Sequence, residues 1–324
     1  MVEGGDPTRP DSIPPGLRWA RRLADLPERR YGRIVSLVPS LSEALVALGL
    51  GDRLVGVTRY CVEPPGAFGG LARVGGTKDA DIDGILALRP DLVIANQEEN
   101  TARVVERLSD RGVAVWVTYP RTVREGAELL RELAGLGASA ERRREIVAPV
   151  FAALEQAESA RAAARRAGRR APRVFCAIWR DPWMTVGEDT YIHDLIALCG
   201  GENVFANSSE SGLAGAAGEA VAAAGEKRAG ATGARRSRDP GRSAAERRYP
   251  IVGLAEIERA APDVILLPSE PYAFGIADRA ELGRLDCPAA AQDRIHLIDG
   301  TLVSWYGPRI AEAIRVLGRL LAIS

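Results

Sequence analysis

The sequence has few of the side chains that bind metals. Its 324 residues include only two histidines and four cysteines, and the cysteines form no Cys-x-x-Cys pair. A zinc or iron–sulfur site is therefore not expected, and the four thiols are predicted to be reduced and mostly buried. Basic and acidic residues balance at 43 each. A neutral chain lacks the positive potential that binds nucleic acid or an anionic membrane surface.

The sequence also lacks long apolar runs and the signatures of common enzymes. No window is long enough to span a membrane, and residues 1–30 carry charges and prolines where a secretion signal needs an apolar core. We therefore expect a cytoplasmic protein without membrane insertion. No Gly-x-Gly-x-x-Gly opens a helix, no phosphate loop is present, and no serine or cysteine nucleophile has a histidine nearby in sequence. The prediction is a non-enzymatic protein with no intrinsic cofactor.

Two distant stretches share one pattern. Residues 82–95 and 254–267 each read as a short amphipathic helix, a Pro-Asp pair and a continuous apolar run, at an offset of 172 residues. The proline ends the helix, and the apolar run is typical of a strand buried on both faces. A helix-to-strand unit written twice indicates two α/β lobes of similar design. Two such lobes predict a ligand-binding cleft between them.

Strands alternating with helices predict parallel sheets and an α/β fold. We expect a polar N-terminal extension at 1–31, an α/β lobe at 32–138, a spine helix at 139–171 and a second α/β lobe at 172–324. Residues 208–247 contain almost no large apolar side chain, which predicts a disordered insertion. Its arginines favour a solvated loop, with contact to an acidic partner as the alternative.

Aromatic side chains gather in loops that follow predicted strands. Trp179 and Trp183 come after the first strand of the second lobe, and Trp305 and Tyr306 precede the final helix. A tryptophan in such a loop beside proline or glycine is less often ordinary core than one on a helix stripe. As a group these residues favour a flat, apolar ligand, with structural packing as the alternative for each one.

Charged residues flank these aromatics. Arg180 follows Trp179, and Arg59 precedes Tyr60; both arginines are predicted either to bind the polar edge of a ligand or to form surface ion pairs. His193 and His296 are candidates for axial metal ligands, but neither has a neighbouring ligand at metal-site spacing. A structural role is therefore favoured for both histidines.

An ordered set of segments resembles a known family. The set comprises Arg33–Gly56, Thr58–Pro65, the Pro90-Asp91 strand, the spine helix, Cys199–Phe205 and Gly307–Arg309. It is similar to the class III, helical-backbone periplasmic binding proteins, and most similar in pattern to the cobalamin-binding proteins of ABC importers. The resemblance implies two Rossmann-like lobes joined by a long helix, a monomer, and a cleft lined with aromatic side chains.

The resemblance also implies roles for single residues. Tyr60 matches the family's ligand-contacting tyrosine, whereas Thr77 and Asn96 stand where cobalamin binders tend to have tryptophan. The glutamates that dock importer-bound members to a permease fall here at Asp83 and at Ala255, beside Glu256. A diverged docking surface makes an ABC permease a doubtful partner, because lost charges weaken steering.

Three functions follow from these observations. The first is non-enzymatic binding of a corrinoid in the inter-lobe cleft, by a cytoplasmic carrier or sensor or by a diverged importer protein. The second is binding of a ferric siderophore or haem, which Arg59 and Arg180 keep open. The third is a protein-interaction module with a degenerate cleft, in which the arginine-rich insertion makes the contact.

Overall fold

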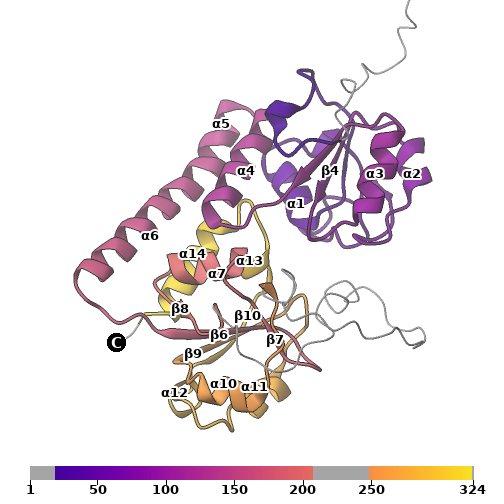
Figure 1. Cartoon of the computed structure of the whole chain (residues 1–324). Helices are drawn as coiled ribbons and strands as arrows, with labels where there is room; N and C mark the ends of the chain where they lie inside the picture. The colour runs from indigo at the N-terminus through magenta and orange to yellow at the C-terminus, as the bar shows by residue number, and fades with distance from the viewer. Residues whose placement is uncertain (1–18, 207–247, 323–324) are drawn as a thin grey trace, which may run out of the picture. The chain divides into compact units, whose positions relative to one another are not determined.

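The computed structural model describes residues 19–206 and 248–322 (Figure 1). The chain divides into two compact units: unit 1 takes residues up to 119 and 128–148, and unit 2 takes 120–127 and the residues from 149 onward. The predicted insertion at 208–247 lies outside the described residues. Within the described part of the chain, no helix has the length and apolar character needed to cross a membrane.

Unit 1 is built on a five-stranded parallel sheet with the strand order β3-β2-β1-β4-β5. Its strands are β1 (Ile34–Ser36), β2 (Leu54–Val57), β3 (Ala72–Arg73), β4 (Leu92–Asn96) and β5 (Val115–Thr118). β4 corresponds to the apolar run predicted at the end of residues 82–95. The two-residue β3 is too short to leave a pattern in the sequence.

Unit 1 also contains helices and short helical turns. They are α1 (Pro39–Ala47), α2 (Ile82–Ala87), α3 (Ala102–Asp110), α4 (Val123–Gly135) and α5 (Ala140–Arg142), with short 3₁₀ turns η1 (Leu23–Asp25) and η2 (Gly51–Arg53). In Figure 1, α2 and α3 lie together on one side of the sheet. Their apolar faces pack against alternate side chains of β1, β4 and β5. The first residues of α4 fall in unit 2 and the rest in unit 1.

The segment predicted as a polar extension contributes to unit 1 from residue 19 onward. Ala20 pairs with the edge of β5, donating to Val115 O (3.0 Å) and accepting from Val117 N (2.8 Å). Tyr31 is buried. A single bridging residue gives no periodic signal, so the sequence pattern could not reveal this pairing.

Helical backbone runs from Ala140 to Arg166, where a spine helix is predicted. It consists of α5, a π-helical turn η3 (Arg143–Val147) and α6 (Ala148–Arg166). Pro149 follows the π turn and has no N–H to donate to the preceding turn, which explains why the regular bonding pattern is interrupted just before it.

Unit 2 has a mixed sheet with the order β10-β9-β6-β7. Its strands are β6 (Arg173–Trp179), β7 (Met184–Thr185), β8 (Glu202–Asn203), β9 (Val264–Pro268) and β10 (Ile295–Ile298). Strands β8, β9 and β10 run parallel to their neighbours, whereas β7 is antiparallel to β6. The sequence predicts a parallel sheet only, and the short β7 is the exception.

Helices cover both faces of this second sheet. They are α7 (Tyr191–Leu198), α10 (Leu254–Arg259), α11 (Ile276–Leu282), α12 (Pro288–Ala291), α13 (Thr301–Ser304) and α14 (Ile310–Leu320). Figure 1 shows α7, α13 and α14 on one face and α10, α11 and α12 on the other. Phe175 and Ala177 of β6, with Ile265 and Leu267 of β9, belong to the core on the α10–α12 side.

The duplicated sequence pattern folds into a duplicated polar clasp at the amino ends of the strands. In unit 1, Arg33 donates through Nε and Nη2 to Leu88 O at the end of α2 (3.1 and 2.7 Å). The Asp91 carboxylate accepts from the backbone N–H groups of Gly32 (2.9 Å) and Arg33 (2.8 Å). The clasp therefore fixes the end of α2, the start of β1 and the start of β4 together.

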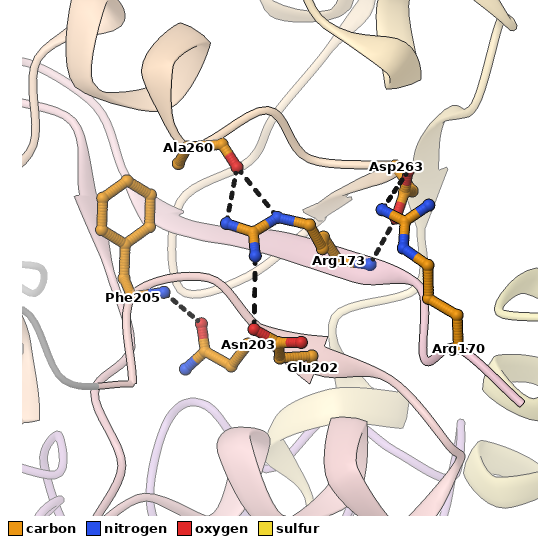
Figure 2. Close-up of polar contacts among 7 residues, drawn as sticks. All are labelled: Arg170, Arg173, Glu202, Asn203, Phe205, Ala260 and Asp263. Carbon is orange, nitrogen blue, oxygen red and sulfur yellow. Dashed lines mark hydrogen bonds and ion pairs between the residues drawn. The ribbon is translucent and has the colours of Figure 1, made fainter. Parts of the chain in front are cut away.

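Unit 2 repeats the clasp (Figure 2). Arg173 donates through Nε and Nη2 to Ala260 O (3.2 and 3.0 Å), and the Asp263 carboxylate accepts from Arg173 N (2.8 Å). Arg170 adds an ion pair to Asp263 at 3.0 Å, and Arg173 Nη1 reaches Glu202 at 3.3 Å. The equivalent contacts in both units show that the repeated sequence specifies a repeated structure.

Candidate functional site

An aromatic cluster lies at the carboxyl ends of the unit 2 strands. Trp179 is the last residue of β6, and Tyr272 and Phe274 lie in the loop after β9. The Trp179 and Tyr272 rings meet edge to face at 5.5 Å, and Tyr272 contacts Phe274 at 4.7 Å. Because β6 and β9 are parallel, their carboxyl ends share one edge, which is where open α/β sheets bind ligands. Trp179 and Tyr272 are half-buried, so part of each ring faces solvent.

Trp183 packs against this cluster. Its ring stacks on Phe274 at 5.6 Å with an interplanar angle of 3°, and only 7% of the residue is exposed. It belongs to the core that α10–α12 cover. The structure thus brings the predicted pair Trp179 and Trp183 into one aromatic group, in which Trp179 is half-buried and Trp183 is buried.

Arg180 is held by carboxylates of its own unit. Its Nη1 pairs with Asp278 and its Nη2 with Glu281, both on α11, and its Nε lies 3.9 Å from Asp181. The hydrogen bond to Asp278 raises the pKa of Arg180, so the guanidinium stays charged. The guanidinium also lies over the Trp183 ring at 5.4 Å. Arg180 therefore forms ion pairs within unit 2.

The segment between α13 and α14 carries the other predicted aromatics. Trp305 is 9% exposed and stacks under Arg309 at 5.0 Å. Tyr306 is buried edge to face against Tyr191 at 5.0 Å. Both aromatic residues therefore pack inside unit 2.

Glu270 connects the loops after β9 and β10. Its carboxylate accepts from Ser304 Oγ (2.7 Å) and from the Trp305 side chain. Burial raises the pKa of Glu270 in spite of these hydrogen bonds, and Arg309 lies near enough to oppose the shift. A Cβ on Gly300 would overlap the Glu270 backbone, so the two loops approach as closely as a glycine allows.

The predicted site residues of unit 1 meet in the loops after β2 and β3. Tyr60 is 39% exposed, and the Arg59 guanidinium lies over its ring at 5.6 Å. Arg59 also pairs with Asp79. A Cβ on Gly76 would collide with the Asp79 carboxylate and press on the Tyr60 ring, so only glycine lets these three side chains converge.

Asn96 has a structural role in unit 1. It is fully buried, and its Oδ1 accepts from Glu98 N (2.8 Å) and Glu99 N (3.3 Å) while its backbone N–H donates to Asn100 Oδ1 (2.7 Å). The amide therefore shapes the turn after β4. Thr77, half-buried, accepts through its backbone O from Asn100 Nδ2 (2.9 Å).

The two predicted docking positions differ. Asp83 is exposed in the first turn of α2. Glu256 folds back as part of a capping box and accepts from Gly253 N at 2.7 Å, while the neighbouring Ala255 is exposed. The first carboxylate points to solvent, whereas the second is used within its own helix.

The two histidines lie in α7 and in β10. His193 is in the first turn of α7, with Nδ1 3.4 Å from Asn203 Nδ2, and His296 is inside β10. Burial lowers the pKa of both imidazoles. Within residues 19–206 and 248–322, no group of three or more His, Cys, Asp or Glu side chains is arranged to hold a metal ion.

Sequence reasoning missed Tyr272 and Phe274. Both follow a buried strand, as Trp179 does, and both sit in a stretch that contains proline and glycine. The criterion applied to the tryptophans would have found them, had it been applied to every aromatic residue.

Comparison with known proteins identifies the family to which this architecture belongs. The family model described as "Periplasmic binding protein" matches residues 34–301. A vitamin B12-binding protein of Yersinia pestis (strain Pestoides F) is 32% identical over 187 residues, which cover 57% of this chain and 64% of that protein. The match thus spans less than two thirds of the curated relative.

Solved structures share the fold. The periplasmic vitamin B12-binding protein of Vibrio cholerae superposes with a TM-score of 0.68 at 24% identity, covering 90% of this chain and 97% of that one. The periplasmic haem-binding protein of Roseiflexus sp. RS-1 gives a TM-score of 0.65, also at 24% identity, over 90% and 98%. At these identities the likeness speaks for the fold alone.

One expectation from the sequence is wrong. The predicted cytoplasmic location is contradicted by the family match and by relatives that are periplasmic binding proteins, which point to the periplasm. That expectation rested on the charges and prolines of residues 1–30, which the family match outweighs. The family consists of solute-binding proteins and not of enzymes. With two α/β units, aromatic strand ends and a family match over most of its length, the chain belongs to the periplasmic binding protein family.

Proposed function

We propose that this chain is a periplasmic solute-binding protein for a corrinoid, working with an ABC importer. The observation that carries the proposal is the edge of unit 2, where the partly exposed Trp179 and Tyr272 stand beside an arginine that is already paired. Such an edge offers apolar contact area without free positive charge. Corrinoids suit it because they are large, half apolar and rimmed with neutral amides. The vitamin B12-binding relatives support the same ligand class.

Unit 1 supplies a second candidate surface. Tyr60 presents an exposed ring and hydroxyl, and the Arg59–Asp79 pair holds it in place. Here too the arginine is matched by a carboxylate. The surface therefore favours stacking and hydrogen bonding over the binding of an anion.

Haem or a ferric siderophore is the alternative ligand. The specific observation in its favour is the exposed phenol of Tyr60, because phenolate oxygen is a known ligand of ferric iron. Haem-binding neighbours among the solved structures support it. The paired arginines speak against it, since haem carries two carboxylates that need cationic partners.

A titration with cyanocobalamin tests the proposal. We expect saturable binding, followed by corrin absorbance and tryptophan fluorescence, with a dissociation constant at or below about 1 μM. Trp179→Ala should weaken binding at least about tenfold, whereas Trp179→Phe, which keeps an aromatic ring, should retain most of the affinity. No binding of cyanocobalamin by the folded protein, with saturable binding of haem, would transfer the function to the alternative.

We expect Trp183 to stabilise the fold and Trp179 to contact the ligand. Because it is buried against Phe274, Trp183→Ala is expected to lower the free energy of unfolding by about 3–5 kcal/mol. Trp179→Ala should cost far less stability, since Trp179 is only half-buried. Urea unfolding of both variants checks this difference. Equal losses would place Trp179 in the core and remove it from the site.

A further inference from the structure

The cluster around Arg180 contains more carboxylates than one guanidinium can neutralise. Asp278 and Glu281 each take one Nη atom, and Asp181 lies near Nε. One positive charge thus faces three negative ones. The cluster begins at the residue that follows Trp179, so its excess negative charge lies beside the exposed aromatic edge.

The two carboxylates of α11 have different duties. Asp278 is needed by the fold, because its Oδ2 accepts from Gly275 N at 2.8 Å and so caps α11. Its side chain is 8% exposed. Glu281 forms an ion pair with Arg180, and its side chain is 27% exposed. A guanidinium that is already paired with a buried aspartate gains little stability from a second carboxylate.

Ring contacts connect the cluster to the exposed edge. The Arg180 guanidinium lies over Trp183, Trp183 stacks on Phe274, and Phe274 contacts Tyr272. Tyr272 in turn meets Trp179. Trp179 and Arg180 are also neighbours in the chain, so the cluster adjoins the residues proposed to hold the ligand. The Asp278 and Glu281 side chains are 8% and 27% exposed, so their charges are less screened by water than that of Asp181, which is 88% exposed.

We propose that Glu281 is a specificity-determining residue, which makes the carboxyl edge of unit 2 reject ligands that carry carboxylates and accept those with neutral amides. It does so in two ways. It occupies the Nη2 atom of Arg180 that would otherwise bind an anion, and it leaves the cluster with net negative charge. The inference rests on the proposed function and deepens it, because it separates neutral corrinoids from anionic chelates.

The experiment compares ligands that differ by one charge. Cyanocobalamin and its monocarboxylic acids, in which one peripheral amide is hydrolysed, have nearly the same size and shape. We expect the protein to prefer cyanocobalamin over at least one monocarboxylic acid by about three- to tenfold at low ionic strength. Glu281→Gln should bring this ratio toward one while changing the affinity for cyanocobalamin itself less than about threefold.

Two further variants control the result. Glu312→Gln removes the same charge from an exposed pair with Arg315 on α14 and should leave the ratio unchanged. Glu281→Asp keeps the charge on a shorter side chain and should preserve the discrimination, which a purely structural role of Glu281 would not require. Circular dichroism confirms that each variant is folded.

The outcomes separate the inference from the proposed function. An unchanged ratio in folded Glu281→Gln overturns the role of Glu281 while corrinoid binding stands. If the unaltered protein binds no corrinoid, the proposed function fails, and haem with its dimethyl ester becomes the charged and neutral pair. Glu281→Gln should then strengthen haem binding relative to the ester. No change in that pair, or no binding of either pair, overturns the inference as well.

Discussion

In both clasps an aspartate carboxylate accepts hydrogen bonds, but the donors differ between the two units. In unit 1, Gly32 and Arg33 both donate a backbone N–H to Asp91. In unit 2 the residue that precedes Arg173 is Pro172, which has no N–H. There the second donor is the Arg170 guanidinium, at 3.0 Å from Asp263 (Figure 2).

This difference teaches what the repeat preserves. The side chain of Arg33 or Arg173 bonds the last helical carbonyl in the same way in both units, at Leu88 O and at Ala260 O. The carboxylate accepts from at least two donor groups in each unit, although in unit 2 one backbone group has been exchanged for a charged side chain. The carboxylate needs donors in both units, but the fold does not dictate their source.

Among changes to the two clasps, removing the carboxylates has the largest expected effect. Asp263→Ala should lower the free energy of unfolding by about 2–4 kcal/mol, because it leaves the Arg173 N–H without its acceptor and Arg170 without its partner. Asp91→Ala should cost about 1–2 kcal/mol, since both its donors are neutral backbone groups. Urea unfolding measures the losses, and hydrogen exchange assigns them to β6–β9 or to β1–β4.

A control keeps this comparison sharp. Asp25→Ala removes a carboxylate that is exposed beside Arg22 and should change stability by less than about 0.5 kcal/mol. Equal losses for Asp263→Ala and Asp91→Ala would mean that the charged donor adds nothing to the clasp of unit 2.

The role of Arg170 can be tested by restoring the backbone N–H that Pro172 lacks. Arg170→Ala should cost about 0.5–1 kcal/mol, a small loss because the Arg170 side chain is 68% exposed. In a Pro172→Ala background the restored N–H can take the place that Gly32 has in unit 1, so the same Arg170→Ala change should cost less. A double-mutant cycle on unfolding free energies measures the coupling. Strictly additive effects would show that Arg170 does not substitute for the missing N–H.

The smallest effect concerns the opposite ends of β9 and β10. Burial raises the pKa of Glu270 above its ordinary value of 4.5, so the folded protein binds this proton more tightly than the unfolded chain. The contribution of Glu270 to stability should therefore decrease as pH rises from about 4.5 to the folded-state pKa. Glu270→Gln should lack this dependence, which unfolding curves at several pH values will detect. Parallel pH profiles would contradict the assignment.

Much of the fold could be predicted from sequence. The Pro90-Asp91 and Pro262-Asp263 units, read from periodicity and proline positions, correspond to the ends of α2 and α10 and the starts of β4 and β9. The exchange of Gly32 for Arg170 could not be predicted, because it depends on which side chain lies near Asp263 in space. Short elements such as β7 escaped for a related reason, since two residues carry no period.

The sequence could predict which aromatic residues gather at the site, but not their burial or their contacts. The post-strand criterion located Trp179 and Trp183 in one cluster, but it could not tell the exposed ring from the buried one. That distinction comes from the stacking of Trp183 on Phe274. The pairing of Arg180 with two acids of α11 joins residues about a hundred positions apart, and no local pattern announces it.

The burial of the thiols bears on survival in an oxidising compartment. The four cysteines are free, and burial raises the pKa of Cys176 and Cys199 to about 12. Oxidants and disulfides react with the thiolate, so a raised pKa keeps Cys176 and Cys199 in the less reactive thiol form at neutral pH. Cys61, Cys176 and Cys287 are also buried away from reagents, so free cysteines are protected from oxidation in a compartment such as the periplasm.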